Sequence, residues 1–95
     1  MLQVIENKII EYLKTYNPHK IAVFGSYVRN QQTTNSDIDL LVDFKKTPTL
    51  LTLIKIENDL SSILGIKVDL LTEGALKNRI IKENIEKDLQ VIYHD

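Results

Sequence analysis

The sequence contains no cysteine, and this absence excludes both disulfide bonds and metal sites built from thiolate ligands. It also lacks any apolar run approaching the ~20 residues that an α-helix needs to span a bilayer. The N-terminal segment carries Glu6 and Glu11 within a helical pattern, so it does not have the features of a signal peptide. These absences predict a cytoplasmic protein that does not act at a membrane.

An excess of positive charge is absent as well. The chain has 12 basic and 13 acidic residues, which give a net charge of −1. A long nucleic acid normally binds a surface on which Lys and Arg are clustered, and no such cluster stands out in the sequence. The charge therefore argues against a long nucleic acid as a partner, while a single nucleotide remains possible.

The composition is that of an ordinary globular protein, with 43% hydrophobic and 26% charged residues. A chain of 95 residues is long enough for one core and has little left for a second. We therefore expect a single domain over residues 1–95.

Helical and strand patterns alternate along the chain. Apolar residues spaced three or four apart predict three main helices. These residues are Leu2, Ile5, Ile9 and Leu13 in the first, Leu50, Leu53, Ile56, Leu60 and Ile63 in the second, and Leu76, Ile80, Ile81 and Ile85 in the third. Short β-prone runs predict four strands, at Lys20–Phe24, Asp37–Phe44, Lys67–Leu71 and Leu89–Tyr93.

Turn and cap residues mark where these elements begin and end. Asn17-Pro18 should end the first helix. Thr47 followed by Pro48 predicts the start of the second helix, and Gly65 its end. A short helix over residues 26–31 and a cap at Thr72 complete the pattern. The alternation predicts an α/β protein with helices packed on a sheet, but it does not give the order of the strands or their direction.

Acidic residues in the second predicted strand are the unusual feature. Asp37 and Asp39 are two residues apart, so their side chains should emerge on one face, roughly 7 Å from each other. Two such carboxylates repel each other unless a proton or a cation intervenes. Mg²⁺ accepts oxygen ligands of this kind and completes its shell with phosphate oxygens and water. Asp69 would join the pair if its strand lies beside Asp37–Phe44.

A second group of residues has the features of a phosphate site. Gly25 ends a predicted strand and Ser26 begins a predicted helix, whose free N–H groups and positive dipole end suit an anion. Arg29 either reaches the same anion or pairs with a nearby acid. Ser36 either contacts the nucleotide or only orients Asp37. These parts together predict metal-assisted phosphoryl transfer.

A simpler interpretation exists for the acidic residues. A lone Asp-x-Asp pair is common on surface strands, but here a strand-terminal Gly-Ser pair precedes it and Asp69 follows it. That combination favours a metal site. Asp43 shares the parity of Asp37 and Asp39, and we interpret it as a solvated residue at the end of its strand.

These motifs resemble the signature of the DNA polymerase β-type nucleotidyltransferase superfamily, and within it that of the minimal nucleotidyltransferase (MNT) group. The matching segments are GSYVRN (Gly25–Asn30), SDIDL (Ser36–Leu40) and VDL (Val68–Leu70). Val28 and Asn30 differ from the alanine and glycine usual in the group. The resemblance extends over most of the chain.

The resemblance implies a small nucleotidyltransferase palm, with a mixed sheet of about four strands flanked by helices. It implies that Asp37, Asp39 and Asp69 are catalytic and hold two Mg²⁺ ions, and that Asp69 also serves as the general base. By the same resemblance, Gly25 and Ser26 would hold the β- and γ-phosphates of ATP.

Within the MNT group, the implied role is that of an antitoxin. The implied partner is a HEPN-domain ribonuclease toxin, and the implied reaction moves AMP from ATP to a tyrosine hydroxyl of that toxin. The residues after Asp69 are accounted for by one helix and one strand, so we expect the acceptor to come from another chain. Two alternatives remain open: an antitoxin that acts by binding alone, and a subunit that modifies a small molecule.

Overall fold

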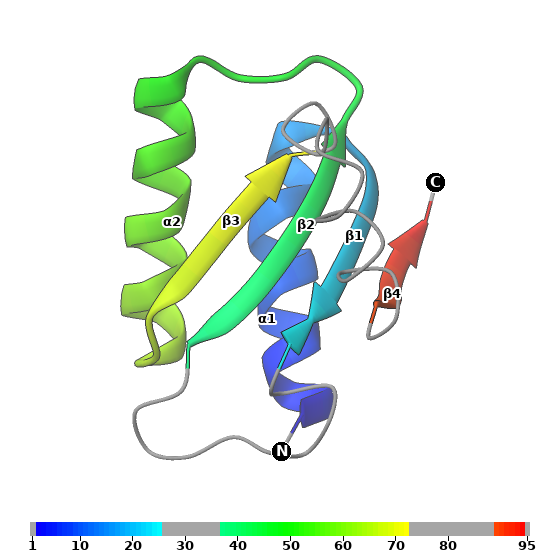
Figure 1. Ribbon diagram of the computed structural model, residues 1–95, viewed down its shortest axis with the longest axis vertical. Coiled ribbons are helices and arrows are strands. Elements are labelled where there is room, and N and C mark those ends of the chain that lie inside the picture. The colour runs from blue at the N-terminus through cyan, green and yellow to red at the C-terminus, as the bar shows by residue number, and fades with distance from the viewer. Residues whose placement is uncertain (1, 26–36, 73–88, 95) are drawn as a thin grey trace.

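The structure is a computed structural model that describes residues 2–25, 37–72 and 89–94. Its elements, in chain order, are α1 (Leu2–Leu13), a 3₁₀ turn η1 (Lys14–Tyr16), β1 (Pro18–Phe24), β2 (Ile38–Phe44), α2 (Leu50–Leu64), β3 (Val68–Thr72) and β4 (Gln90–His94) (Figure 1). Every predicted element that falls in the described ranges is present. The helices expected over residues 26–31 and after Thr72 lie outside them.

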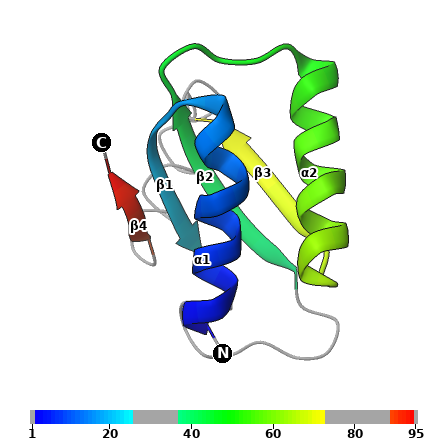
Figure 2. The same cartoon turned by 180° about the vertical axis from the view of Figure 1, so that it is seen from behind.

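The strands form one mixed sheet in the order β3-β2-β1-β4. β1 runs antiparallel to both β2 and β4, while β2 and β3 run parallel. Both described α-helices lie on the same face of this sheet, as Figure 2 shows from behind. The predicted α/β fold with a four-stranded mixed sheet is therefore confirmed.

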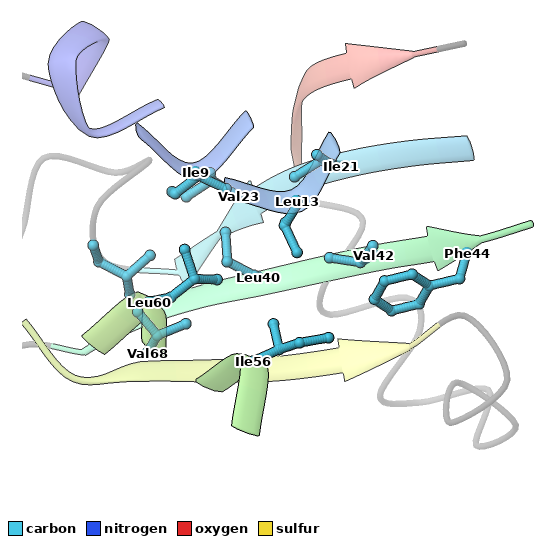
Figure 3. Close-up of a cluster of buried hydrophobic side chains, with 11 residues drawn as sticks. Ile9, Leu13, Ile21, Val23, Leu40, Val42, Phe44, Ile56, Leu60 and Val68 are labelled. Carbon is cyan, nitrogen blue, oxygen red and sulfur yellow. The ribbon is translucent and has the colours of Figure 1, made fainter. Parts of the chain in front are cut away.

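The hydrophobic core lies between the sheet and these helices (Figure 3). Alternate residues of β2 point into it, and they are Ile38, Leu40, Val42 and Phe44. From the helices, Ile9 and Leu13 of α1 and Ile56 and Leu60 of α2 are all completely buried. The strand period of two and the helical period near 3.6 both predict this inward set.

The beginning and end of α2 differ in how well the sequence predicted them. Thr49, not Thr47, is the N-cap: its hydroxyl accepts a hydrogen bond from the Thr52 backbone N–H at 3.3 Å. The prediction placed the cap two residues early because it used Pro48 as the first helical residue. Gly65 is the C-cap, as predicted, with φ +68° and its N–H bonded to the Ser61 carbonyl at 2.9 Å.

The predicted apolar face of α2 was partly wrong. Leu50 is 73% exposed and Ile63 is 44% exposed. Leu50 lies six residues before Ile56, which places it about 120° away around the helix axis. Ile63 instead lines an open groove between α1 and α2, together with Val4 and Tyr12. This groove is on the helical side of the sheet.

The strand boundaries shift by one or two residues from the prediction. β1 begins at Pro18, a position where proline is tolerated because it is the first residue of a strand. The residue before it, Asn17, takes the left-handed conformation with φ 54°, which separates η1 from β1. Asp37 comes just before β2 rather than within it. No helix in the described part of the chain is long and apolar enough to cross a membrane.

Candidate active site

Four of the predicted site residues, Gly25, Asp37, Asp39 and Asp69, lie at one end of the sheet, where β1 ends and β2 and β3 begin (Figure 1). Gly25 directly follows β1, and Asp37 directly precedes β2. Asp39 is paired with Phe24 of β1 on one side and with Asp69 of β3 on the other. The sequence expectation that Asp69 lies beside the Asp37–Asp39 segment is therefore confirmed by the strand register.

The alternation of side chains along the strands decides which way the carboxylates point. Ile38 and Leu40 are buried in the core, so Asp39 between them emerges on the sheet face away from α1 and α2. Asp69 follows Val68, which is also a core residue, and it emerges on the same face. Both aspartates are only half-buried, which leaves them accessible to a ligand.

Gly25 is the point where the backbone approaches a carboxylate most closely. Its φ is +84°, a conformation that L side chains rarely adopt. In addition, a Cβ atom at this position would overlap the Oδ2 atom of Asp39. Only glycine therefore allows this turn without displacing Asp39. This explains why position 25, in the predicted phosphate loop, requires glycine.

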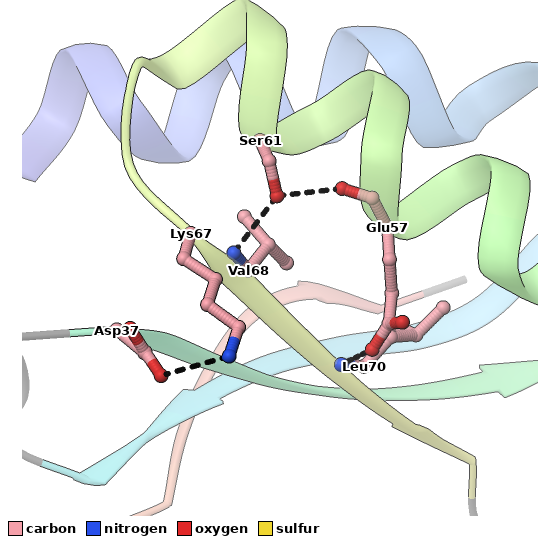
Figure 4. A network of polar contacts seen from close by, with 6 residues as sticks. All are labelled: Asp37, Glu57, Ser61, Lys67, Val68 and Leu70. Carbon is pink, nitrogen blue, oxygen red and sulfur yellow. Dashed lines mark hydrogen bonds and ion pairs between the residues drawn. The ribbon is translucent and has the colours of Figure 1, made fainter.

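The charges around Asp69 are unbalanced. Burial raises the pKa of the Asp69 carboxyl, and the neighbouring Asp37 carboxylate raises it further, while Lys67 acts in the opposite direction. Lys67 also lies 4.0 Å from Asp37, measured from its Nζ atom to Oδ2 (Figure 4). Both side chains of this ion pair are partly solvated, so the attraction is modest. Among the described residues, the surroundings of Asp69 thus have an excess of negative charge that a cation would neutralise.

This donor set fits a hard divalent cation, because it consists of carboxylate oxygens that repel one another in the absence of a positive charge. Within the described ranges, no three or more His, Cys, Asp or Glu side chains are arranged to hold a metal ion by themselves. The carboxylates would therefore provide part of a coordination shell, and phosphate oxygens and water would complete it. The role of Asp37, Asp39 and Asp69 as Mg²⁺ ligands stays a prediction.

Three of the predicted site residues, Ser26, Arg29 and Ser36, lie outside the described residues. Asp43 was interpreted from the sequence as a residue outside the site. Asp43 is half-buried near the other end of β2, where its register partner is Lys20. Four residues of strand, roughly 13 Å, separate it from Asp39.

The sequence did not indicate three residues that contact Asp37 or the backbone of β3 around Asp69. Lys67 lies two residues before Asp69 and pairs with Asp37. Glu57 and Ser61 reach from α2 to the backbone of β3 (Figure 4). The one available signal was that each of these two polar residues directly follows a buried residue of the helix, Ile56 or Leu60.

Comparison with known families and sequences gives one consistent set of relatives. The family model described as polymerase beta nucleotidyltransferase matches residues 7–95. A Methanocaldococcus jannaschii protein, provisionally named a protein adenylyltransferase, is 55% identical over 74 residues, which are 78% of this chain and 76% of that protein. The protein adenylyltransferase MntA of Thermococcus cleftensis is 43% identical over 72 residues, which are 76% of this chain and 73% of that protein.

Solved structures agree with this. A chain in the crystal structure of a toxin–antitoxin with AMP-PNP superposes with a TM-score of 0.84 at 27% identity, over 95% of this chain and 73% of its own length. A chain in the structure of a tri-AMPylated Shewanella oneidensis HEPN toxin in complex with MNT antitoxin gives a TM-score of 0.80 at 25% identity, over 100% and 74%.

Proposed function

Because the chain belongs to the polymerase beta nucleotidyltransferase family, we propose that it is an antitoxin that transfers AMP from ATP to a tyrosine hydroxyl of a partner HEPN-type toxin. The single observation that carries this proposal is the pairing of Asp39 with Asp69 beside Asp37 and Gly25. This arrangement supplies acidic ligands next to a turn that brings the backbone close to them. A cytoplasmic location is part of the proposal.

The relatives support the choice of reaction and partner. Two of them carry names that assign them to the protein adenylyltransferases. One structural relative is described as a complex with AMP-PNP, an ATP analogue, and another as a complex with an AMPylated HEPN toxin. The same reaction on the same class of acceptor is the simplest function for a chain that carries the acidic pair and the third aspartate.

Each residue of the site has a distinct part in the proposed reaction. Asp37 and Asp39 would hold the Mg²⁺ ions, and Gly25 would let the nucleotide phosphates approach the end of β1, where Ser26 and Arg29 are the predicted phosphate contacts. When bound, Mg²⁺ supplies positive charge for the phosphates and makes the attacking hydroxyl more acidic. Asp69 lies opposite Asp39, where it would receive the proton of that hydroxyl.

The proposed step is a displacement at the α-phosphorus of ATP. The tyrosine oxygen forms a bond to the α-phosphorus of ATP, and the bond from that phosphorus to the bridging oxygen of the β-phosphate breaks. Pyrophosphate leaves with the electron pair of the broken bond. The tyrosine proton moves to the Asp69 carboxylate, so the protein residues act by positioning, proton transfer and charge stabilisation.

The test is intact-mass spectrometry of the partner toxin after co-expression with this chain and incubation with Mg-ATP. We expect one or more AMP units on a tyrosine of the toxin, and none when Asp37→Asn is used as the control. A toxin that is neutralised without any gain in mass would favour an antitoxin that acts by binding alone. A gain in mass on a small molecule instead would favour a subunit that modifies a small molecule.

A further inference from the structure

The outer edge of β3 is bonded to side chains of α2. Among the described strands, β3 is the last on its side of the sheet and pairs with β2 alone. Two of its outward-facing backbone N–H groups, at Val68 and Leu70, would otherwise point away from the sheet. The Val68 N–H donates to Ser61 Oγ at 2.9 Å, and the Leu70 N–H donates to Glu57 Oε2 at 2.7 Å (Figure 4).

One of these two acceptors, the Ser61 hydroxyl, is held in place by the helix itself. Ser61 donates its hydroxyl hydrogen to the Glu57 carbonyl oxygen at 2.7 Å, which leaves a lone pair of the same oxygen for Val68. Glu57 and Ser61 are four residues apart on α2, a rise of about 6 Å. Val68 and Leu70 are two residues apart on β3, a rise of about 6.6 Å. The two spacings match, so both bonds form without distortion of either element.

Asp69 lies between the two bonded N–H groups. Val68 and Leu70 pack with the core on the helical face, and Asp69 emerges on the other face opposite Asp39. Along the outer edge of β3, Glu57 and Ser61 therefore fix the backbone before and after Asp69. Along the inner edge, the hydrogen bonds to β2 fix it. A catalytic group needs such support, because a misplacement of about 1 Å can reduce a rate by as much as 10²-fold.

We propose that Glu57 and Ser61 are positioning residues that hold Asp69 in register with Asp39; this inference rests on the proposed function of that site. Neither side chain touches the reacting atoms. They act through the backbone of β3, by closing hydrogen bonds that the edge of the sheet cannot close by itself. The important property of Glu57 is its acceptor oxygen, which a glutamine also offers.

The experiment compares substitutions that keep or remove the acceptor, in the complex of the full chain with its partner toxin. Glu57→Ala should lower kcat for AMP transfer by about 10–10²-fold with little change in the KM for ATP. Glu57→Gln should stay within about threefold of the unmodified chain, because the amide oxygen can still accept from Leu70. Ser61→Ala should lower kcat, whereas Ser62→Ala, an exposed neighbour with the same change in composition, should not.

Amide hydrogen exchange provides the second measurement. Exchange of the Leu70 amide should become faster in Glu57→Ala and remain slow in Glu57→Gln. If Leu70 exchanges faster in Glu57→Ala while kcat is unchanged, the bond is only structural and the inference fails. The inference also fails if Glu57→Gln and Glu57→Ala lose activity equally, because the charge would then matter instead of the bond.

Failure of the proposed function would look different. If the unmodified chain transfers no AMP, the reaction is wrong, and the backbone ¹H–¹⁵N resonances of Asp69 and Asp39, which report the geometry of the strands, decide the positioning inference. Glu57→Ala should shift both resonances, and Glu57→Gln should shift them clearly less. Unchanged resonances in Glu57→Ala would overturn the inference. If Glu57→Ala does not fold, Ser61→Ala against Ser62→Ala gives the same comparison.

Discussion

The two faces of the sheet differ sharply, although the same strands build both. On the face covered by α1 and α2, Ile38, Leu40 and Val42 of β2 are almost completely buried. On the opposite face, Asp39 of the same strand is half-buried beside Asp69. At this end of β2, a step of one residue therefore changes the surroundings from an apolar core to a group of carboxylates, whereas Leu41, further along the face of Asp39, is buried.

This difference shows how a small protein can tolerate a cluster of like charges. Carboxylates that repel each other reduce the free energy of unfolding, because the repulsion exists only in the folded state. Burial of the alternate side chains against the helices offsets that loss, at roughly 25 cal/mol per Å² of apolar area. Substitutions of core residues on the helical face should therefore change mainly stability, and substitutions of the aspartates on the other face mainly activity.

The largest expected effect is on the acidic face. Asp39→Asn should reduce AMP transfer by on the order of 10³-fold, because a proposed Mg²⁺ ligand is lost and with it positive charge that stabilises the transition state. The melting temperature in EDTA should change little, because asparagine keeps the shape of this half-buried side chain. The measurements are the rate of mass gain on the toxin and a thermal melt. Full activity together with a clear fall in melting temperature would contradict the division between faces.

On the helical face, a substitution should reduce stability strongly and activity only slightly. Leu40→Ala removes a fully buried side chain from the core and should lower the free energy of unfolding by about 2–5 kcal/mol. The residual folded protein at low temperature should transfer AMP at nearly the normal rate. Urea unfolding gives the first value, and single-turnover kinetics on the folded fraction give the second. A stable Leu40→Ala protein that has lost its activity would show that the two faces are coupled.

The sequence predicted the face of the sheet on which a residue lies better than it predicted the neighbours of that residue on other strands. The alternation in Ile38–Phe44 predicted which β2 residues face the helices, because a strand has a side-chain period of two. It did not predict that Leu41, on the same face as Asp39, is also buried. Periodicity gives the face of a residue but not its neighbour on the next strand. The pairing of Asp39 with Asp69 was therefore only conditional until the parallel pairing of β2 and β3 was known.

The contacts between α2 and the site could not be predicted for a related reason. The bonds from Glu57 and Ser61 to the edge of β3 depend on how α2 is rotated and on how far it is shifted along that strand. Neither quantity is encoded in local patterns. The N-cap was missed for a more local reason: Thr47 and Thr49 flank Pro48, and only the bond from Thr52 to Thr49 distinguishes them.

A smaller effect is expected at the glycines. Gly25→Ala should destabilise the protein by about 1–2 kcal/mol, because the new side chain would occupy a left-handed conformation with φ +84°. It should also lower activity by more than tenfold, since its Cβ displaces the Asp39 carboxylate. Gly65 is a matched control, with φ +68° but no atom within 4 Å of an added Cβ.

Gly65→Ala should therefore lose a similar amount of stability and keep its activity. Thermal melts and initial rates of toxin modification on the same two proteins separate these effects. Equal losses of activity in Gly25→Ala and Gly65→Ala would mean that backbone strain, and not the contact with Asp39, explains the need for glycine at position 25.

The smallest effect concerns the pH dependence of stability at Asp69. Burial and the Asp37 carboxylate raise the pKa of Asp69 in the folded protein, so its ionised form is less favourable there than in the unfolded chain. Its contribution to stability is therefore fully present below the unfolded pKa of about 3.9 and is lost as pH rises through the folded pKa. Asparagine does not titrate. In EDTA, Asp69→Asn should gain stability relative to the unmodified protein between pH 4 and pH 7, as measured by urea unfolding at each pH. A relative loss over that interval would mean that the carboxylate of Asp69 is stabilised in the folded protein and that the acidic face carries no repulsion for the core to offset.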